Sequence, residues 1–150
     1  MVPVESLFEA HLNVGDLTRS MNFYGETLGL ELATILDKPR VAFYWMGGRG
    51  KSMLGLWETG TAPQRMSLHI AFTVELTNLL QAPEKLRSAG ITPLDHTRNP
   101  TCEPVVFGWM PAASVFFRDP DENLLEYIAM LPDSPQPELG VVPWSVWTRR

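Results

Sequence analysis

A repeated pattern constrains the fold of this chain more than any other feature of its sequence. The segment EAHLNVGDL begins at Glu9, and the segment HIAFTVELT begins at His69. Both alternate apolar residues with the period of a β-strand, and Val14 and Val74 each lie five residues after the starting position. Glu9 and His69 are therefore equivalent positions in two copies of one pattern.

The repeat extends to the end of each copy. Residues 54–56, LGL, match residues 125–127, LEY, which pairs Gly55 with Glu126. Two copies are too few for a solenoid, but two four-stranded sheets can curl together around a common cleft. We expect a functional site between the two copies.

The first copy predicts a βαβββ module over about residues 7–58. Asp16 stands where a helix N-cap is expected, the apolar residues up to Leu28 follow with helical spacing, and Gly29 suits the C-terminal cap. The expected strands are residues 7–14, 30–36, 41–46 and 52–57.

The second copy predicts the same order over about residues 67–130. A strand at residues 67–74 precedes a helix that runs to about Ala89 with Gly90 as its cap. Pro83 is expected in the first turn of that helix, because further inside it would remove a backbone donor. A further strand begins at residues 91–94, and residues 113–118 and 123–129 form a hairpin around DPDE after a long loop.

These elements predict an α+β fold in which two βαβββ modules form a curled eight-stranded cleft or half-barrel. Residues 1–130 are expected to be a single domain. Residues 131–150 are proline-rich and then contain Trp144 and Trp147, so we expect an ordered tail without a regular element.

Composition limits the classes of partner. The chain has 150 residues, a formal net charge of -5 and no run of like charges, which argues against binding to nucleic acid. Apolar stretches are too short to cross a bilayer, and the amino-terminal sequence MVPVESLFEA does not resemble an export signal. Cys102 is the only cysteine, which is typical of a reducing compartment. We therefore expect a cytoplasmic protein with no membrane partner.

Three segments resemble a known family: HLNVGDLTRSMNFYGETLGLEL, LHIAFTV around His69, and FFRDPDENLLEYI around Glu126. They are similar to the vicinal oxygen chelate family, which includes glyoxalase I, fosfomycin-resistance thiol transferases, extradiol dioxygenases, methylmalonyl-CoA epimerase and bleomycin-binding proteins. Many members of this family are dimers, so the resemblance and the exposed sheet edges together favour a homodimer.

The resemblance implies metal ligands on the first and last strands of each module. The corresponding positions are Glu9, Gly55, His69 and Glu126. Glu9 stands where the family usually has histidine, and Gly55 stands where glyoxalase I has a carboxylate. His11 lies on the same side of its strand as Glu9, so either could be a ligand. Such a set of nitrogen and oxygen donors suits divalent Mn, Fe, Co, Ni or Zn.

Each candidate ligand also has a structural interpretation. Glu126 stands in the apolar run LLEYI, where a carboxylate that met neither a cation nor a donor would cost several kcal/mol to bury. His69 and Glu126 are thus either ligands or a buried hydrogen-bonded pair. One of Glu9 and His11 could instead bond the other or line the pocket. His96 stands in a loop and is expected in solvent.

Two functions remain open from the sequence. The first is a metal-dependent enzyme that binds a small molecule through two neighbouring oxygens, with Glu9 or Glu126 as the catalytic group that transfers a proton. A lyase or isomerase, a thiol transferase and a dioxygenase all fit. The second is a metal-free protein that binds a small molecule or an antibiotic. In either case Trp57, Phe43 and Trp109 are the candidates to line the pocket.

Overall fold

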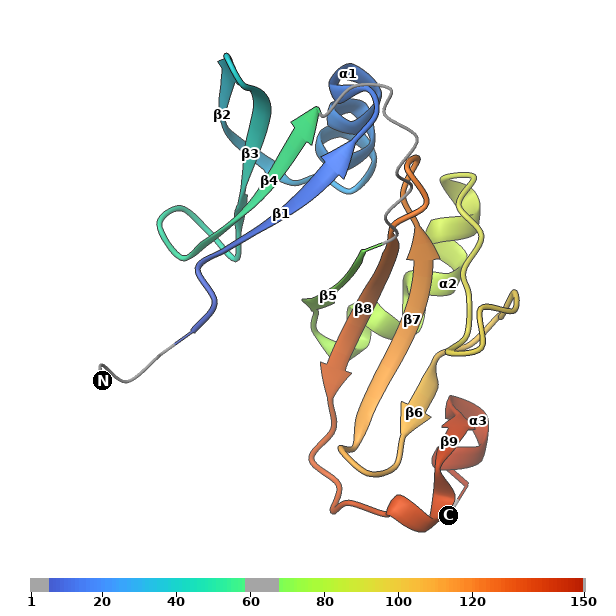
Figure 1. Cartoon of the computed structure of the whole chain (residues 1–150). Coiled ribbons are helices and arrows are strands. Elements are labelled where there is room, and N and C mark those ends of the chain that lie inside the picture. Colours follow the sequence, from blue (N-terminus) through green and yellow to red (C-terminus); the bar gives the residue numbers. More distant parts are fainter. Residues whose placement is uncertain (1–5, 59–67, 150) are drawn as a thin grey trace. The chain divides into compact units, whose positions relative to one another are not determined.

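The computed structural model describes residues 6–58 and 68–149, and the chain forms two compact units (Figure 1). The first unit runs to Leu68 and also includes the turn Asp119–Asp121. The second unit comprises His69–Arg118 and Glu122–Arg150. Ser67, which the sequence placed in a strand, lies outside the described residues.

The first unit contains a four-stranded sheet in the order β1-β4-β3-β2. Its strands are β1 (Glu9–Val14), β2 (Glu31–Asp37), β3 (Arg40–Met46) and β4 (Ser52–Glu58). β1 runs parallel to β4, and the other neighbours are antiparallel. All four strands were expected from the sequence.

One helical segment follows β1 and packs on one face of this sheet (Figure 1). The side chain of Asp16 accepts a hydrogen bond of 3.0 Å from the backbone of Arg19, which caps α1 (Leu17–Met21) as expected. The helix continues as the π-helical turn η1 (Asn22–Thr27), and Gly29 follows with a φ of 72°. The π-helical turn was not expected. The hydrophobic side chains buried among the described residues of this unit are Leu12, Val14, Leu17, Tyr24, Val41, Ala42, Tyr44, Leu54 and Leu56.

The second unit contains a five-stranded sheet in the order β5-β8-β7-β6-β9. Its strands are β5 (His69–Thr73), β6 (Val105–Phe107), β7 (Ala112–Arg118), β8 (Leu124–Met130) and β9 (Val141–Pro143). The helix α2 (Leu76–Ser88) packs on β7 and β8. Its buried residues, Leu79, Ala82, Pro83 and Leu86, recur with helical spacing and so form one apolar face.

Two expectations for this unit were wrong. Residues 91–94 form no strand; only Leu94 makes isolated bridges, to Phe116 and Pro100, and the strand beside β7 is β6 instead. Pro83 lies inside α2 rather than in its first turn. The helix continues through Pro83 because this residue belongs to the buried apolar face, and that packing offsets the missing backbone donor.

The carboxyl-terminal segment has more regular structure than expected. It contains the 3-10 turn η2 (Pro137–Leu139), the strand β9 paired with β6, and the short helix α3 (Trp144–Trp147). Trp147 is buried, and the carboxylate of Glu103 accepts hydrogen bonds from the backbone and the hydroxyl of Ser145. The expectation of a tail without a regular element was therefore wrong, because backbone pairing to β6 was not visible in the sequence.

The α+β class and the two βαβββ modules are confirmed, with β9 as an added strand. The register supports the equivalence inferred from the repeat. Glu9 pairs with Met53 two residues before Gly55, and His69 pairs with Leu124 two residues before Glu126. No helix among the described residues is long and apolar enough to span a membrane.

Candidate functional site

The first unit presents a polar and aromatic face on the side of its sheet away from the core. Leu12 and Val14 of β1 point into the core, so Glu9 and His11 point to the opposite face. The register places His11 beside Gly55, and Gly55 beside Phe43. Trp57 lies two residues further along the same face. This face therefore brings together four of the residues expected from the sequence around one glycine.

Glu9 and His11 form the first pair. The Nε2 atom of His11 and the Oε1 atom of Glu9 are in direct contact, and the two side chains are 42% and 35% exposed. The imidazole lies 5.4 Å from the ring of Trp57 and 5.9 Å from the ring of Phe43, between centroids. Both donor atoms of this pair thus converge on one accessible point of the face.

Gly55 leaves the space in which the His11 ring lies. A Cβ atom at position 55 would lie 2.7 Å from Cδ2 and 3.2 Å from Nε2 of His11. It would also lie 3.1 Å from Cε1 of Phe43. Any side chain at position 55 would therefore displace the imidazole.

The indole of Trp57 has an unpaired donor. Its Nε1 atom is buried and has no hydrogen-bond partner among the described residues. A buried donor without an acceptor costs about 1–3 kcal/mol, so it is a suitable place for a water molecule or a ligand oxygen to bind.

His69 and Glu126 form the second pair, in the second unit. The Nε2 atom of His69 lies 2.9 Å from Oε2 of Glu126, and the His69 side chain is 49% exposed. Glu126 is buried, with 5% of its surface exposed. The hydroxyl of Ser114 donates to the other carboxylate oxygen at 2.5 Å. Both carboxylate oxygens therefore have a partner, which offsets the cost of burying the group.

Ser114 is a site residue that the sequence analysis missed. It lies on β7, two residues from Phe116, which pairs with Glu126. Strand parity supplies the signal that could have found it, because Ser114 is the one polar side chain in the run AASVFF. The Phe116 ring packs 6.0 Å from His69 between centroids.

Comparison with known proteins identifies the family. Residues 6–127 match the model of the Glyoxalase/Bleomycin resistance protein/Dioxygenase superfamily. The chain belongs to this superfamily. The match covers both modules and both pairs.

Similar structures have been solved for several members of the superfamily. An integron cassette protein from the mobile metagenome of the Halifax Harbour sewage outfall is 31% identical, with a TM-score of 0.71 over 85% of this chain and 100% of that one. The lactoylglutathione lyase of Agrobacterium tumefaciens is 19% identical, with a TM-score of 0.64 over 85% and 95% of the two chains. The oxidase ChaP-H2 is 19% identical, with a TM-score of 0.67 over 89% and 100%. The last two show likeness of fold alone.

The sequence resemblance implied a metal site, so the donor chemistry of the two pairs matters. Each pair offers an imidazole nitrogen and a carboxylate oxygen, which divalent transition metals accept. In residues 6–58 and 68–149 no group of three or more His, Cys, Asp or Glu side chains is gathered that could hold a metal ion. Each pair fits a cation as two donors, and neither is a complete ligand set alone.

Two further residues from the sequence analysis lie apart from the second pair in their unit. Trp109 is 60% exposed in the turn between β6 and β7. This turn precedes Ala112, the first residue of β7. His69 pairs with Leu124, and Leu124 pairs with Arg118, the last residue of β7. Trp109 and His69 are therefore near opposite ends of that strand. His96 lies in an exposed loop, as expected.

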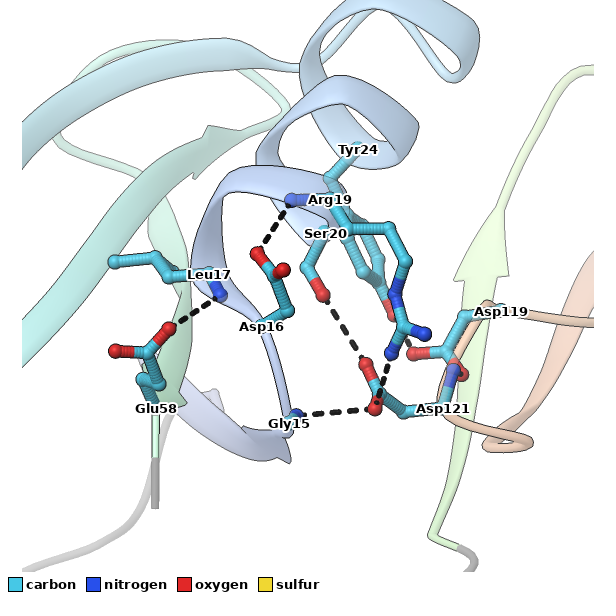
Figure 2. Close-up of polar contacts among 9 residues, drawn as sticks. All are labelled: Gly15, Asp16, Leu17, Arg19, Ser20, Tyr24, Glu58, Asp119 and Asp121. Carbon is cyan, nitrogen blue, oxygen red and sulfur yellow. Dashed lines mark hydrogen bonds and ion pairs between the residues drawn. The ribbon is translucent and has the colours of Figure 1, made fainter. Parts of the chain in front are cut away.

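Asp119 and Asp121 belong to the segment RDPD, which is part of the family resemblance, and they form a separate polar cluster (Figure 2). Asp121 accepts hydrogen bonds from the backbone of Gly15 at 3.0 Å, from Arg19 at 2.7 Å and from Ser20 at 3.1 Å. The hydroxyl of Tyr24 donates to Asp119 at 2.8 Å. The pKa of Tyr24 is raised, mainly because the hydroxyl is buried and secondly because the charge of Asp119 is close to it. The turn thus holds the amino-terminal part of the first helix, which is a structural role.

Proposed function

We propose that this protein is a metal-dependent enzyme that acts on a small molecule carrying two neighbouring oxygen atoms. The proposed ligands are the first pair, Glu9 and His11, and the second pair, His69 and Glu126. A divalent cation held by these side chains would supply an electrophile and an open position for substrate oxygens.

One observation carries the proposal. Each unit has one histidine in contact with one carboxylate, and the repeat makes Glu9 of the first pair equivalent to His69 of the second. A repeat that places a potential metal ligand at the same position of both copies supports metal binding more than two unrelated ion pairs would. The superfamily membership of residues 6–127 adds to this support.

The two carboxylates differ in a way that suggests different roles. Glu126 is buried and held at both oxygens, by Ser114 and His69, which suits a fixed ligand. Glu9 is 35% exposed and bonds only to His11 among the described residues. Glu9 is therefore the better group to accept a proton from a carbon beside the substrate oxygens.

Phe43 and Trp57 supply the apolar wall next to the first pair. The reaction itself stays open between a glyoxalase-like lyase or isomerase, a thiol transferase and a dioxygenase. The lyase and the oxidase among the similar structures indicate that this fold serves more than one kind of reaction.

Metal analysis tests the proposal. Tag-free protein purified without chelator and without a nickel column should contain close to one divalent transition metal per chain, or bind one on addition. His69→Ala and Glu126→Gln should each lower the affinity for that metal at least tenfold. The matched control is His96→Ala, because His96 is the third histidine of the chain and lies in the exposed loop.

A metal-free binding protein is the second candidate. This second candidate is favoured because His11 and His69 each already contact a carboxylate within their own unit. Failure to bind Mn, Fe, Co, Ni or Zn at millimolar concentration would favour the binder and reject the enzyme proposed above.

A further inference from the structure

The surroundings of Gly55 distinguish between Glu9 and His11 as first-strand ligands for the proposed metal. We propose that the imidazole of His11 takes the ligand position for which residue 55 has no side chain, so that a single strand supplies both ligands of the first module. This inference rests on the proposed function and deepens it.

Steric fit is the first argument. The Nε2 atom of His11, which is the atom that would bind a metal, lies 3.2 Å from the position of a Cβ at residue 55. A carboxylate on a short side chain at position 55 would bring its oxygens into the same space. His11 and a ligand at position 55 are therefore alternatives, and Gly55 decides between them.

The packing of the imidazole is the second argument. Trp57 lies against one side at 5.4 Å between centroids, with an angle of 38° between the ring planes. Phe43 contacts the same ring edge-on at 5.9 Å and 71°. A histidine that served only to bond a carboxylate in solvent would need no such enclosure. These contacts restrict the ring orientation while leaving 42% of the side chain exposed, as a ligand requires.

The position of Glu9 is the third argument. Its carboxylate contacts the Nε2 atom of His11 rather than Nδ1, so the two donor atoms meet at one point. Neither side chain has another hydrogen bond among the described residues that would hold it away from a cation. Glu9 and His11 together thus provide the oxygen and nitrogen donors that the first module would otherwise take from two strands.

Substitution at both positions tests the inference. Affinity for Co²⁺ is measured by chelator competition, and visible absorption of bound Co²⁺ reports loss of an imidazole ligand. His11→Ala should weaken binding at least tenfold and change the spectrum. The double variant His11→Ala with Gly55→Glu should regain at least half of the lost binding free energy, because the vacated space accepts the carboxylate.

A smaller variant tests the steric step alone. Gly55→Ala should also weaken Co²⁺ binding, because its Cβ displaces the His11 ring. Gly25→Ala is the matched control, since a Cβ there meets Tyr44 at an ordinary 3.5 Å. Melting temperatures of all variants identify those that fail to fold. If Gly55→Ala does not fold, the double variant still decides the question, because the imidazole is absent from it.

The outcomes separate this inference from the function on which it rests. Wild-type protein that binds no Co²⁺ contradicts the metal-dependent function itself. Wild-type protein that binds Co²⁺, with His11→Ala unchanged in affinity and spectrum, overturns the role of His11 and leaves the other ligands standing. A double variant no better than His11→Ala alone overturns the equivalence with position 55.

Discussion

Single residues differ in how visible they are in the sequence. His69, Glu9 and Gly55 were assigned positions by the repeat alone, and the strand registers place them as the repeat requires. Ser114 was missed, because its role depends on a cross-strand neighbour rather than on its own segment. The contact of the His11 ring with the space at Gly55 could not be predicted from the sequence either, because it depends on the orientation of that ring.

Glu122 gives a residue-scale prediction for stability. It has a φ of 68°, a left-handed conformation that costs a non-glycine residue about 1–2 kcal/mol. Glu122→Gly should remove this conformational cost. Because glycine loses more backbone entropy on folding, the net gain in stability should be only about 0.5 kcal/mol. Chemical denaturation measures the difference. Glu84→Gly on the exposed side of α2 is the control and should destabilise by about 1 kcal/mol. Equal destabilisation by both variants would contradict the argument from φ.

Helices and strands were predicted best where their capping residues and apolar pattern lie within the same segment. The capped first helix and the four strands of the first unit follow from Asp16, Gly29 and the alternation of apolar residues. β6 and β9 are short strands that depend on partners distant in the sequence, so the sequence indicated neither. The π-helical turn likewise has no signal in apolar spacing.

The amino-terminal end of α1 gives an element-scale prediction about pH. The backbone N–H of Leu17 donates to Glu58 at 2.8 Å (Figure 2). Arg40 donates to both oxygens of the same carboxylate, and these bonds lower the pKa of Glu58 from its ordinary value of 4.5. The stabilisation is therefore fully present above pH 4.5 and is lost as pH falls through the lowered pKa of the folded protein.

Glu58→Gln should remove this component. Its melting temperature should fall below that of wild type at pH 6, and the gap should narrow as pH falls to 3. Glu84→Gln is the control and should show a small gap that does not change with pH. A constant gap for Glu58→Gln would show that the carboxylate does not stabilise the helix through its charge.

Gly108 tests how the carboxyl-terminal segment is attached. Its backbone N–H donates to the carbonyl of Gly140 at 2.8 Å, and its carbonyl accepts from the N–H of Gln136 at 2.8 Å. A Cβ at position 108 would lie 2.4 Å from the backbone oxygen of Gln136. Gly108→Ala should destabilise the protein by about 1–3 kcal/mol and increase amide exchange in β9 and α3. Gly25→Ala serves as the control. Unchanged exchange in those elements would mean that Gly108 does not hold the segment.

On the scale of the whole molecule, the sequence predicted the superfamily and the two modules, and the homodimer that it favours stays a prediction. The outer strands of the first sheet, β1 and β2, and of the second, β5 and β9, have no further strand beside them among the described residues. Leu32, Ile35 and Leu36 of β2 are each more than 40% exposed. Free edges and exposed apolar side chains of this kind favour association between copies.

We therefore expect a homodimer at micromolar concentration. Sedimentation should give about twice the chain mass of 16.9 kDa. Ile35→Lys should shift the mass towards the monomer if β2 lies in the interface, whereas Leu80→Lys, on the exposed side of α2, is the control. A wild-type monomer under these conditions would contradict the expectation.

The central proposal to be tested is the proposed function, in which His11 and His69 are both metal ligands. The chain has only three histidines, so the imidazole NMR signals of His11, His69 and His96 can be followed separately while Co²⁺ is added to tag-free protein. The account predicts that the signals of His11 and His69 shift along one shared curve that saturates at one equivalent per chain, while His96 is least affected. Separate curves for His11 and His69, or a shift of only one of them, would contradict it.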